Sequence, residues 1–167
     1  IGSGNMAAAM VRGWVAADAS AAARIHLTDR GSGRASELAA SVASGEHRPH
    51  VHATNLELVA ASDVIVLCVK PIDIEDVLRE ISAGVEPRHV LASVAAGVQM
   101  ATMENLLDER VPVLRFMPNV PVEVNAGTLV YARGRAASEL VDAVLAQFEA
   151  LGTIVELQER LFDAATA

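Results

Sequence analysis

The 167-residue chain is 52% hydrophobic but only 3% aromatic, so aliphatic side chains must fill its core. A net charge of −8 argues against a nucleic-acid or anionic-membrane surface. No apolar run approaches the roughly 18 residues that span a bilayer. The single cysteine, Cys68, excludes a disulfide framework and favours a reducing, cytoplasmic compartment. We expect one cytoplasmic domain, or one domain and the start of a second, with no nucleic-acid or membrane partner.

The chain opens on the pattern G-x-G-x-x-A at residues 2–7, followed by helical spacing of apolar residues over 5–17. In a dinucleotide-binding turn, Gly2 permits the tight strand-to-helix turn and Gly4 lets the backbone approach the pyrophosphate. Ala7 would keep the helix close to the sheet, and the amides of residues 3–6 would face an anion. The alternative is a chance glycine-rich turn before an ordinary helix.

Strand and helix patterns then alternate along the chain. Strands are predicted at 24–29, 50–52, 63–69, 90–94, 111–117, 128–132 and 153–157. Helices are predicted from 32 or 33 to 44 and at 55–61, 73–83, 100–107 and 136–151, with the start of another at 159–167. The alternation predicts an α/β fold: a Rossmann-like, doubly wound, mostly parallel sheet with helices on both faces and a truncated first strand.

Ligands of such sheets bind beyond the carboxyl ends of the strands, so the residues after each strand are the candidates. Asp29 and Arg30 follow the second strand, near the place of an adenosine ribose. Asp29 alone favours NAD, because a carboxylate repels a 2′-phosphate, whereas Arg30, Ser32 and Arg34 favour NADP. We expect NADP, with NAD possible; a solvated turn is the alternative.

Three further loops follow predicted strands. Pro71 holds Lys70 extended at a strand tip, where the cofactor ribose would pass. The small residues 95–97 allow a flat ring to approach closely, although a plain turn explains them equally well. Residues 117–119, with Pro121 behind them, form a rigid loop that holds the Asn119 amide at the cleft edge.

Other reactive residues carry no predicted site. His50 and His52 share a strand face, but no third ligand has a suitable spacing, so no metal site is expected. Cys68 lies in an apolar strand and is expected to be a buried hydrophobe rather than a nucleophile. No Ser/His/Asp arrangement or carboxylate pair stands out, so no catalytic side chain is assigned.

Taken together, these motifs resemble those of pyrroline-5-carboxylate reductase, the last enzyme of proline biosynthesis. The matching segments are I-G-S-G-N-M-A at 1–7, V-K-P at 69–71, S-V-A-A-G-V at 93–98, R-F-M-P-N at 115–119 with Pro121, and D-A-A-T-A at 163–167. They cover essentially the whole chain in the family's order. Phe116 and Val120 depart from the smaller or more polar residues common in the family.

The resemblance implies an NAD(P)H-dependent enzyme that reduces 1-pyrroline-5-carboxylate to L-proline. It implies a substrate-side loop of Met117, Pro118 and Asn119, and no metal. The cofactor-binding residues that it implies are Ile1, Gly2, Ser3, Gly4, Asn5, Met6, Asp29, Arg30, Asn55, Val69, Lys70, Pro71, Val94, Ala95, Ala96 and Gly97.

The resemblance also implies a domain organisation. Residues 1–157 would form the NAD(P)-binding domain, and 158–167 would begin a linker or helix to a missing C-terminal helical domain. That domain would form the homo-oligomer and supply most contacts to the small-molecule substrate. We therefore expect an N-terminal fragment clipped at both ends and inactive alone.

Three alternatives remain at this stage. One is another NADP-dependent dehydrogenase of 6-phosphogluconate-dehydrogenase-like architecture, acting on a β-hydroxyacid or a prephenate-like substrate. The second is a non-catalytic dinucleotide-binding or redox-sensing module. The third is a fragment that folds poorly because its central strand is nearly missing.

Overall fold

The computed structural model describes residues 1–135 and 139–165. The first three residues of the predicted helix 136–151 and the last two of the predicted segment 159–167 lie outside the described residues. Within the described ranges, no helix combines the length and the apolar character required to cross a membrane.

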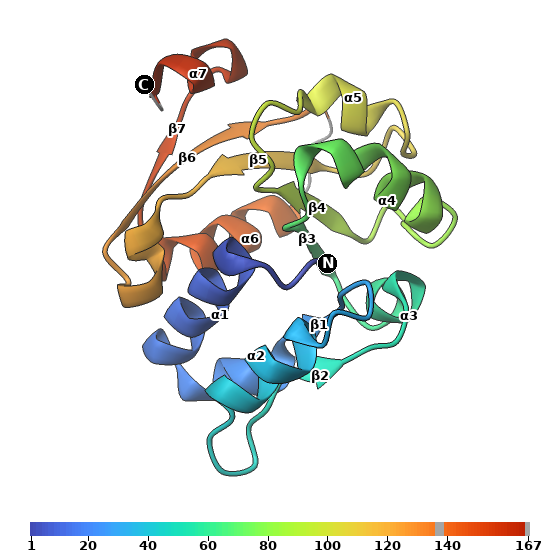
Figure 1. Cartoon of the computed structure of the whole chain (residues 1–167). Coiled ribbons are helices and arrows are strands. Elements are labelled where there is room, and N and C mark those ends of the chain that lie inside the picture. The colour runs from blue at the N-terminus through green and yellow to red at the C-terminus, as the bar shows by residue number, and fades with distance from the viewer. Residues whose placement is uncertain (136–138, 166–167) are drawn as a thin grey trace.

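In the described residues, seven strands form two sheets (Figure 1). The larger has the order β3-β4-β5-β6-β7, and the smaller pairs β1 with β2. All neighbouring strands are parallel except β5 and β6. The strands are β1 (His26–Leu27), β2 (His50–Val51), β3 (Val64–Leu67), β4 (Val90–Ser93), β5 (Val113–Met117), β6 (Gly127–Arg133) and β7 (Gly152–Glu156).

Residues 1–2 join the two sheets. The Ile1 amino group donates to the Val66 carbonyl at 2.8 Å, and the Cys68 amide donates to the Ile1 carbonyl at 2.8 Å. On the other side, the Gly2 amide donates to the Thr28 carbonyl at 3.1 Å. This two-residue segment therefore lies between β1 and β3, and the strand order reverses across it. The mostly parallel, doubly wound sheet predicted from the sequence is confirmed.

Helices cover both faces of the larger sheet (Figure 1). One apolar cluster packs α3, α4 and α5 against the sheet, and a second packs α1 and α6 against its other side. Along α4, Ile74, Val77, Leu78 and Ile81 are buried at helical spacing. The helices are α1 (Asn5–Ala17), α2 (Arg34–Val42), α3 (Asn55–Ala60), α4 (Ile74–Ile81), α5 (Met100–Glu104), α6 (Glu139–Glu149) and α7 (Phe162–Ala165).

Several elements are shorter than predicted, and short 3₁₀ turns take up part of the difference. Pro71, which has no amide hydrogen, opens the turn η2 (Pro71–Asp73) before α4 begins. The turns η1 (Ala19–Arg24), η3 (Val120–Val124) and η4 (Glu159–Leu161) were not predicted. Only residues 118–126 connect β5 to β6, too few for a parallel crossover, so β6 returns antiparallel.

We predict that Gly13→Ala destabilises the fold. Gly13 lies where α1 packs against η3, and a Cβ there would collide with the Val122 carbonyl oxygen and approach Leu151 Cδ2 to 2.7 Å. Overpacking of this kind costs about 1–3 kcal/mol, which exceeds the helix-propensity gain of alanine. Urea denaturation should show a lower free energy of unfolding. An unchanged midpoint would contradict this packing between α1 and η3.

Candidate functional site

Two structural constraints favour glycine at position 2 of the turn. Its φ is +86°, a conformation that side chains other than glycine rarely adopt. A Cβ there would also lie 2.8 Å from Val69 Cγ1 and 2.9 Å from the Cys68 carbonyl oxygen. Gly2 therefore permits the tight turn and also brings it against the end of β3.

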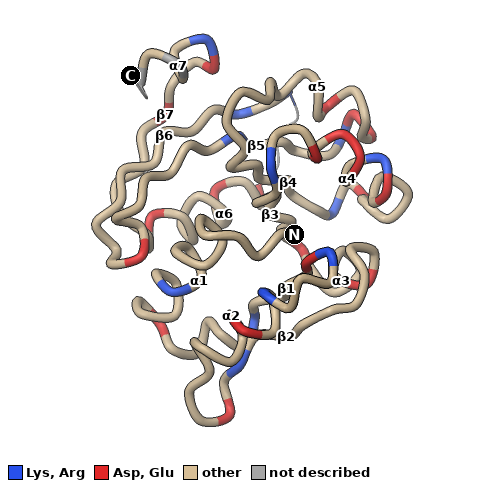
Figure 2. The backbone as a smooth tube through the Cα atoms, viewed as in Figure 1, with Lys and Arg blue, Asp and Glu red and all other residues tan. Residues whose placement is uncertain are grey.

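Gly4 has a different role. A Cβ on Gly4 would meet no atom within 4 Å, so the backbone is open on that side. Gly4 is the N-cap of α1, has no side chain to cap the helix, and is followed by a first turn without acidic residues. Figure 2 shows no charged residue between the N-terminus and the end of the first turn of α1. A helix N-terminus with exposed amides binds anions, so the turn fits the diphosphate of a dinucleotide.

A chain of side-chain hydrogen bonds joins this turn to neighbouring strand ends. Ser3 Oγ donates to the Thr28 carbonyl at 3.0 Å, and Thr28 Oγ1 donates to Asn55 Oδ1 at 2.8 Å. Asn55 Nδ2 in turn donates to Glu80 Oε2 at 3.0 Å. The structure thus brings together the predicted residues Ser3 and Asn55 through Thr28, which no sequence pattern indicated.

The Asp29 carboxylate is engaged by the start of α2. It accepts from the Ala35 amide at 2.7 Å, the Ser32 amide at 3.0 Å and Ser32 Oγ at 3.1 Å. The bond from the Ala35 amide and those from Ser32 lower the pKa of Asp29 below its ordinary value. Its acceptor capacity is therefore largely used within the protein.

The next residue, Arg30, links two of the loops that follow strands. Its Nη1 lies 3.0 Å from Asp73 Oδ1 in η2, so an ion pair joins the loop after β1 to the loop after β3. The Arg30 side chain remains 66% exposed, which leaves its other guanidinium donors accessible to a ligand.

The loops after β3 and β4 lie side by side. The Val94 amide donates to the Leu67 carbonyl at 3.1 Å, which places the start of 94–97 beside that of 69–71. Gly97 has a φ of +75°, and a Cβ there would meet no atom within 4 Å. Ala95 is buried, whereas Ala96 is exposed. These loops adjoin Gly2 through Val69, so the predicted segments share one edge of the sheet.

The predicted substrate-side loop is fixed by its own amide side chain. Asn119 Oδ1 accepts from the Thr128 amide at 2.9 Å and so holds the loop against the start of β6. Met117 and Pro118 are half-buried, and Asn119 is exposed. This Asn119 bond indicates that the amide positions the loop.

A partly buried ion pair, not predicted from the sequence, involves Arg115 on the strand that leads into this loop. Arg115 on β5 is 4% exposed and donates to Glu159 Oε1 at 2.9 Å. The same Glu159 oxygen accepts from the Met100 amide at 2.8 Å, where α5 begins. Arg115 also lies over the ring of Phe162, 4.8 Å from its centroid. The sequence feature that could have indicated this ion pair is the charge of Arg115 within an otherwise apolar strand.

The remaining reactive residues form no metal site. Across the described positions, no group of three or more His, Cys, Asp or Glu side chains is placed to hold a metal ion. His26 Nδ1 and His52 Nε2 lie 2.7 Å apart, and burial lowers the pKa of His26. Burial also raises the pKa of the Cys68 thiol, which stays protonated and unreactive at neutral pH.

Comparisons with known proteins agree with this geometry. The family model for NADP oxidoreductase coenzyme F420-dependent proteins matches residues 1–97. Pyrroline-5-carboxylate reductase of Pseudomonas aeruginosa is 33% identical over 169 residues, covering 100% of this chain and 60% of that protein. Pyrroline-5-carboxylate reductase 2 of Homo sapiens is 37% identical over 172 residues, covering 99% and 52%. This chain therefore spans little more than half the length of these curated relatives.

A solved structure supports the fold. The crystal structure of Plasmodium falciparum pyrroline carboxylate reductase with NADP bound superposes with a TM-score of 0.82 at 23% identity. The superposition covers 99% of this chain and 58% of that one. At this identity the likeness establishes the Rossmann-like architecture.

We predict that Asp29 stabilises the fold through α2 rather than through a ligand. Asp29→Ala should lower the free energy of unfolding at pH 7 by about 1 kcal/mol, as for loss of a helix cap. Because the folded-state pKa lies below the ordinary 3.8, this contribution is present above that value and is lost as pH falls through the folded pKa. Urea denaturation at pH 7 and pH 2.5 checks it, with Asp29→Asn as the matched variant that cannot titrate. An equal loss at both pH values would contradict the assignment.

Proposed function

Because this chain belongs to the family of NADP oxidoreductase coenzyme F420-dependent proteins, we propose that it is the dinucleotide-binding part of a pyrroline-5-carboxylate reductase. The enzyme would reduce 1-pyrroline-5-carboxylate to L-proline with NADPH in the cytoplasm. The observation that carries the proposal is the similarity of the whole chain to such reductases, at 33% and 37% identity. The glycine turn and the adjoining loops supply a site of the required kind.

The cofactor would lie along the strand tips. Residues 1–6 would hold the pyrophosphate through backbone amides. Arg30 would bind a 2′-phosphate together with Arg34, which is exposed at the start of α2. Because the oxygens of the Asp29 carboxylate already accept hydrogen bonds from α2 and Ser32, they are less available to a ribose 2′-hydroxyl, which favours NADP over NAD. Asn55 and the loops 69–71 and 94–97 would line the rest of the groove.

The protein's contribution to the reaction would be binding and orientation. When bound, the reduced nicotinamide supplies a hydride to the carbon of the C=N bond, whose nitrogen takes up a proton. The small residues 95–97 would leave room for a flat ring, and residues 117–119 would limit the position of the cyclic imine. We assign no side chain of the described residues as the proton donor; the proton would come from solvent or from another part of the protein.

The complete protein would contain the two domains that the resemblance implies. Residues 1–157 would form the NAD(P)-binding domain, and 158–167 would lead into a helical domain that forms the homo-oligomer. Arg115, Glu159 and Met100 would keep this connection in register with the cofactor loop. The 167 residues alone would bind the dinucleotide without turnover.

The direct test is activity of the complete protein that carries this chain. With NADPH and 1-pyrroline-5-carboxylate, the absorbance of the reduced nicotinamide should fall as proline forms. Gly4→Ala should weaken NADPH binding at least about tenfold, because its methyl group would occupy the open approach to the turn. Its free energy of unfolding should stay within about 0.5 kcal/mol of the parent, unlike that of Gly13→Ala.

The outcomes separate the alternatives. Absence of turnover near neutral pH would overturn the reductase proposal. NADPH binding without turnover of this or other imines would indicate a dinucleotide-binding module. Turnover of a β-hydroxyacid instead would indicate a dehydrogenase.

A second prediction concerns cofactor choice. Arg30→Ala and Arg34→Ala should each raise the Kd for NADPH about tenfold, the loss of one exposed charge-assisted contact, and change that for NADH less than about twofold. Arg110→Ala is the matched control, since Arg110 is also exposed but pairs with Asp108 ahead of β5. Fluorescence titration measures both constants. Equal losses for the two cofactors would show that these arginines do not contact a 2′-phosphate.

A further inference from the structure

The loop 94–99 connects β4 to α5 and is anchored by hydrogen bonds at its two ends. At its start, the Ala95 amide donates to Ser93 Oγ at 3.3 Å. At its end, the Met100 amide donates to Glu159 Oε1 at 2.8 Å. Between these two bonds, no amide of the loop bonds to another group in the part of the chain that the structure describes. The conformation of the loop therefore depends on how its ends are held.

Arg115 links the two ends of this loop. It is the register partner of Ser93, the last residue of β4, and so lies beside the start of the loop. Its Nη1 donates to Glu159 Oε1 at 2.9 Å, so one carboxylate oxygen holds both Arg115 and the end of the loop. Met117, at the end of the same strand, lies on the same face as Arg115, because alternate residues of a strand share a face. Arg115 is thus next to both loops that would face the reacting groups.

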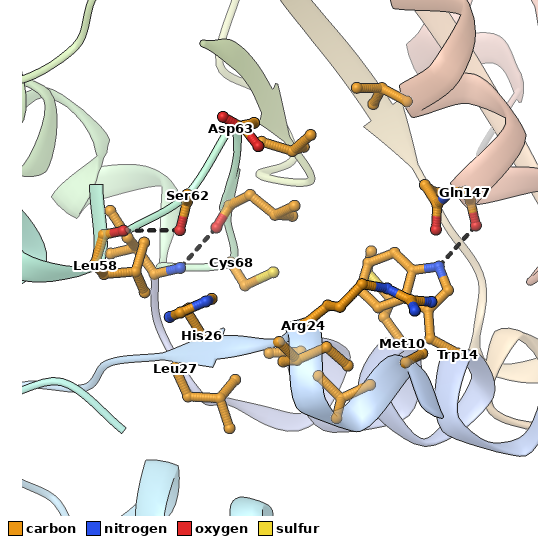
Figure 3. A pocket seen from close by; sticks show the side chains of 18 of the residues that line it. Met10, Trp14, Arg24, His26, Leu27, Leu58, Ser62, Asp63, Cys68 and Gln147 are labelled. Carbon is orange, nitrogen blue, oxygen red and sulfur yellow. Dashed lines mark hydrogen bonds between the residues drawn. The ribbon is translucent and has the colours of Figure 1, made fainter. Parts of the chain in front are cut away.

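Glu159 is the main polar partner of the Arg115 side chain. The Arg115 side chain is 4% exposed and that of Glu159 is 24% exposed. Arg115 Nε is buried and bonds to no group among the described residues, so Glu159 is the acceptor there on which the guanidinium depends. The apolar cavity of about 670 Å³ between β1, β3, α1 and α6 (Figure 3) does not explain this nitrogen, because Arg115 does not line it. The contacts of Arg115 therefore favour support of the loops over binding of a ligand in that cavity.

We propose that Arg115 and Glu159 are positioning residues for the nicotinamide end of the cofactor, because together they hold the loop 94–99 at both ends. Neither side chain would touch the cofactor or the substrate. The inference rests on the proposed function, in which residues 95–97 leave room for the nicotinamide ring. A shift of the loop by about 1 Å would change the distance and angle of hydride transfer, and a misplacement of this size costs about a hundredfold in rate.

Loss of the pair would affect the two halves of the cofactor differently. The adenosine half would bind at the glycine turn and near Arg30, which neither Arg115 nor Glu159 contacts. Binding of adenosine 2′,5′-bisphosphate, which lacks the nicotinamide, should therefore be unchanged, whereas kcat should fall. A merely structural role would lower the amount of folded protein and leave kcat per folded molecule as it was.

The test compares Glu159→Ala with Glu159→Gln in the complete protein that carries this chain. Glu159→Ala removes both bonds, so kcat should fall about tenfold to a hundredfold, with changes below about threefold in the KM for NADPH and the Kd for adenosine 2′,5′-bisphosphate. Glu159→Gln retains an oxygen that can accept from the Met100 amide and should keep at least about a third of the parent kcat. Glu156→Ala is the matched control, because Glu156 also pairs with an arginine of the sheet, Arg133, but bonds to neither loop.

A second variant controls for folding. Glu159→Ala leaves the Arg115 charge buried without a counterion, which can unfold a protein. The double variant Arg115→Met with Glu159→Ala removes that charge and should show the same fall in kcat as the single variant, because both release the same end of the loop. Amide hydrogen exchange at Met100 should be faster than in the parent for both.

A fall in kcat for Glu159→Ala and for the double variant, with recovery in Glu159→Gln, would support the proposal. Unchanged kcat per folded molecule would overturn it, as would an equal fall for Glu156→Ala, because general destabilisation would then explain the loss.

Failure of the proposed function is distinguishable from failure of this inference. If the unaltered protein reduces no imine, the reductase proposal is wrong. NADPH-dependent slowing of amide exchange at residues 96–99 of the unaltered protein, absent from Glu159→Ala, would still support the positioning role. Without such slowing in the unaltered protein, the positioning role would be wrong as well.

Discussion

Three backbone hydrogen bonds at residues 1–2 hold the two sheets of this protein together. They give the Gly2 turn its position between β1 and β3, and every other part of the candidate site is placed relative to that turn. Side-chain interactions reinforce the junction: Ser3 bonds to Thr28, Thr28 bonds to Asn55, and Arg30 pairs with Asp73. The geometry of the glycine turn therefore depends directly on the spacing between β1 and β3.

The site works against the charge of the whole molecule. A net charge of −8 disfavours an anionic cofactor at long range, but screening confines that effect to about 8–10 Å at physiological salt. Within that distance lie the uncharged first turn of α1 and the exposed guanidinium of Arg30, the groups proposed to bind the cofactor. In the proposed function, the backbone amides of this turn, with Arg30 and Arg34, would bind a phosphate-bearing ligand on an acidic protein.

The sequence was most informative where a residue type has one physical explanation. Gly2 has the positive φ and crowded surroundings that the tight turn of the G-x-G-x-x-A pattern requires, and Gly4 has open space beside its backbone. The alternating apolar segments likewise located the strands and most helices. The predicted ends of helices and strands were less accurate, because hydrogen bonds formed in the folded chain determine them. The Asp29 carboxylate, for example, accepts from the Ala35 amide in the first turn of α2.

Long-range pairings were beyond the reach of sequence patterns. Nothing near Arg115 in the chain indicates that Glu159 would reach it, or that the same carboxylate would bond to the start of α5. The pairing of Arg30 with Asp73 was equally unpredictable, because the sequence around each residue indicates only a solvated loop. Such partners are decided by the strand order, which only the folded chain reveals.

The pairing of Arg30 with Asp73 also constrains how this protein can diverge. Replacing Arg30 by an acidic residue, the simplest route to a ribose without a 2′-phosphate, would place a negative charge opposite Asp73 and push η2 away from β1. If Arg30 contacts the nucleotide as proposed, a change of nucleotide preference at this position is expected to be accompanied by a change at residue 73. The two positions are expected to be inherited as a pair rather than to drift independently.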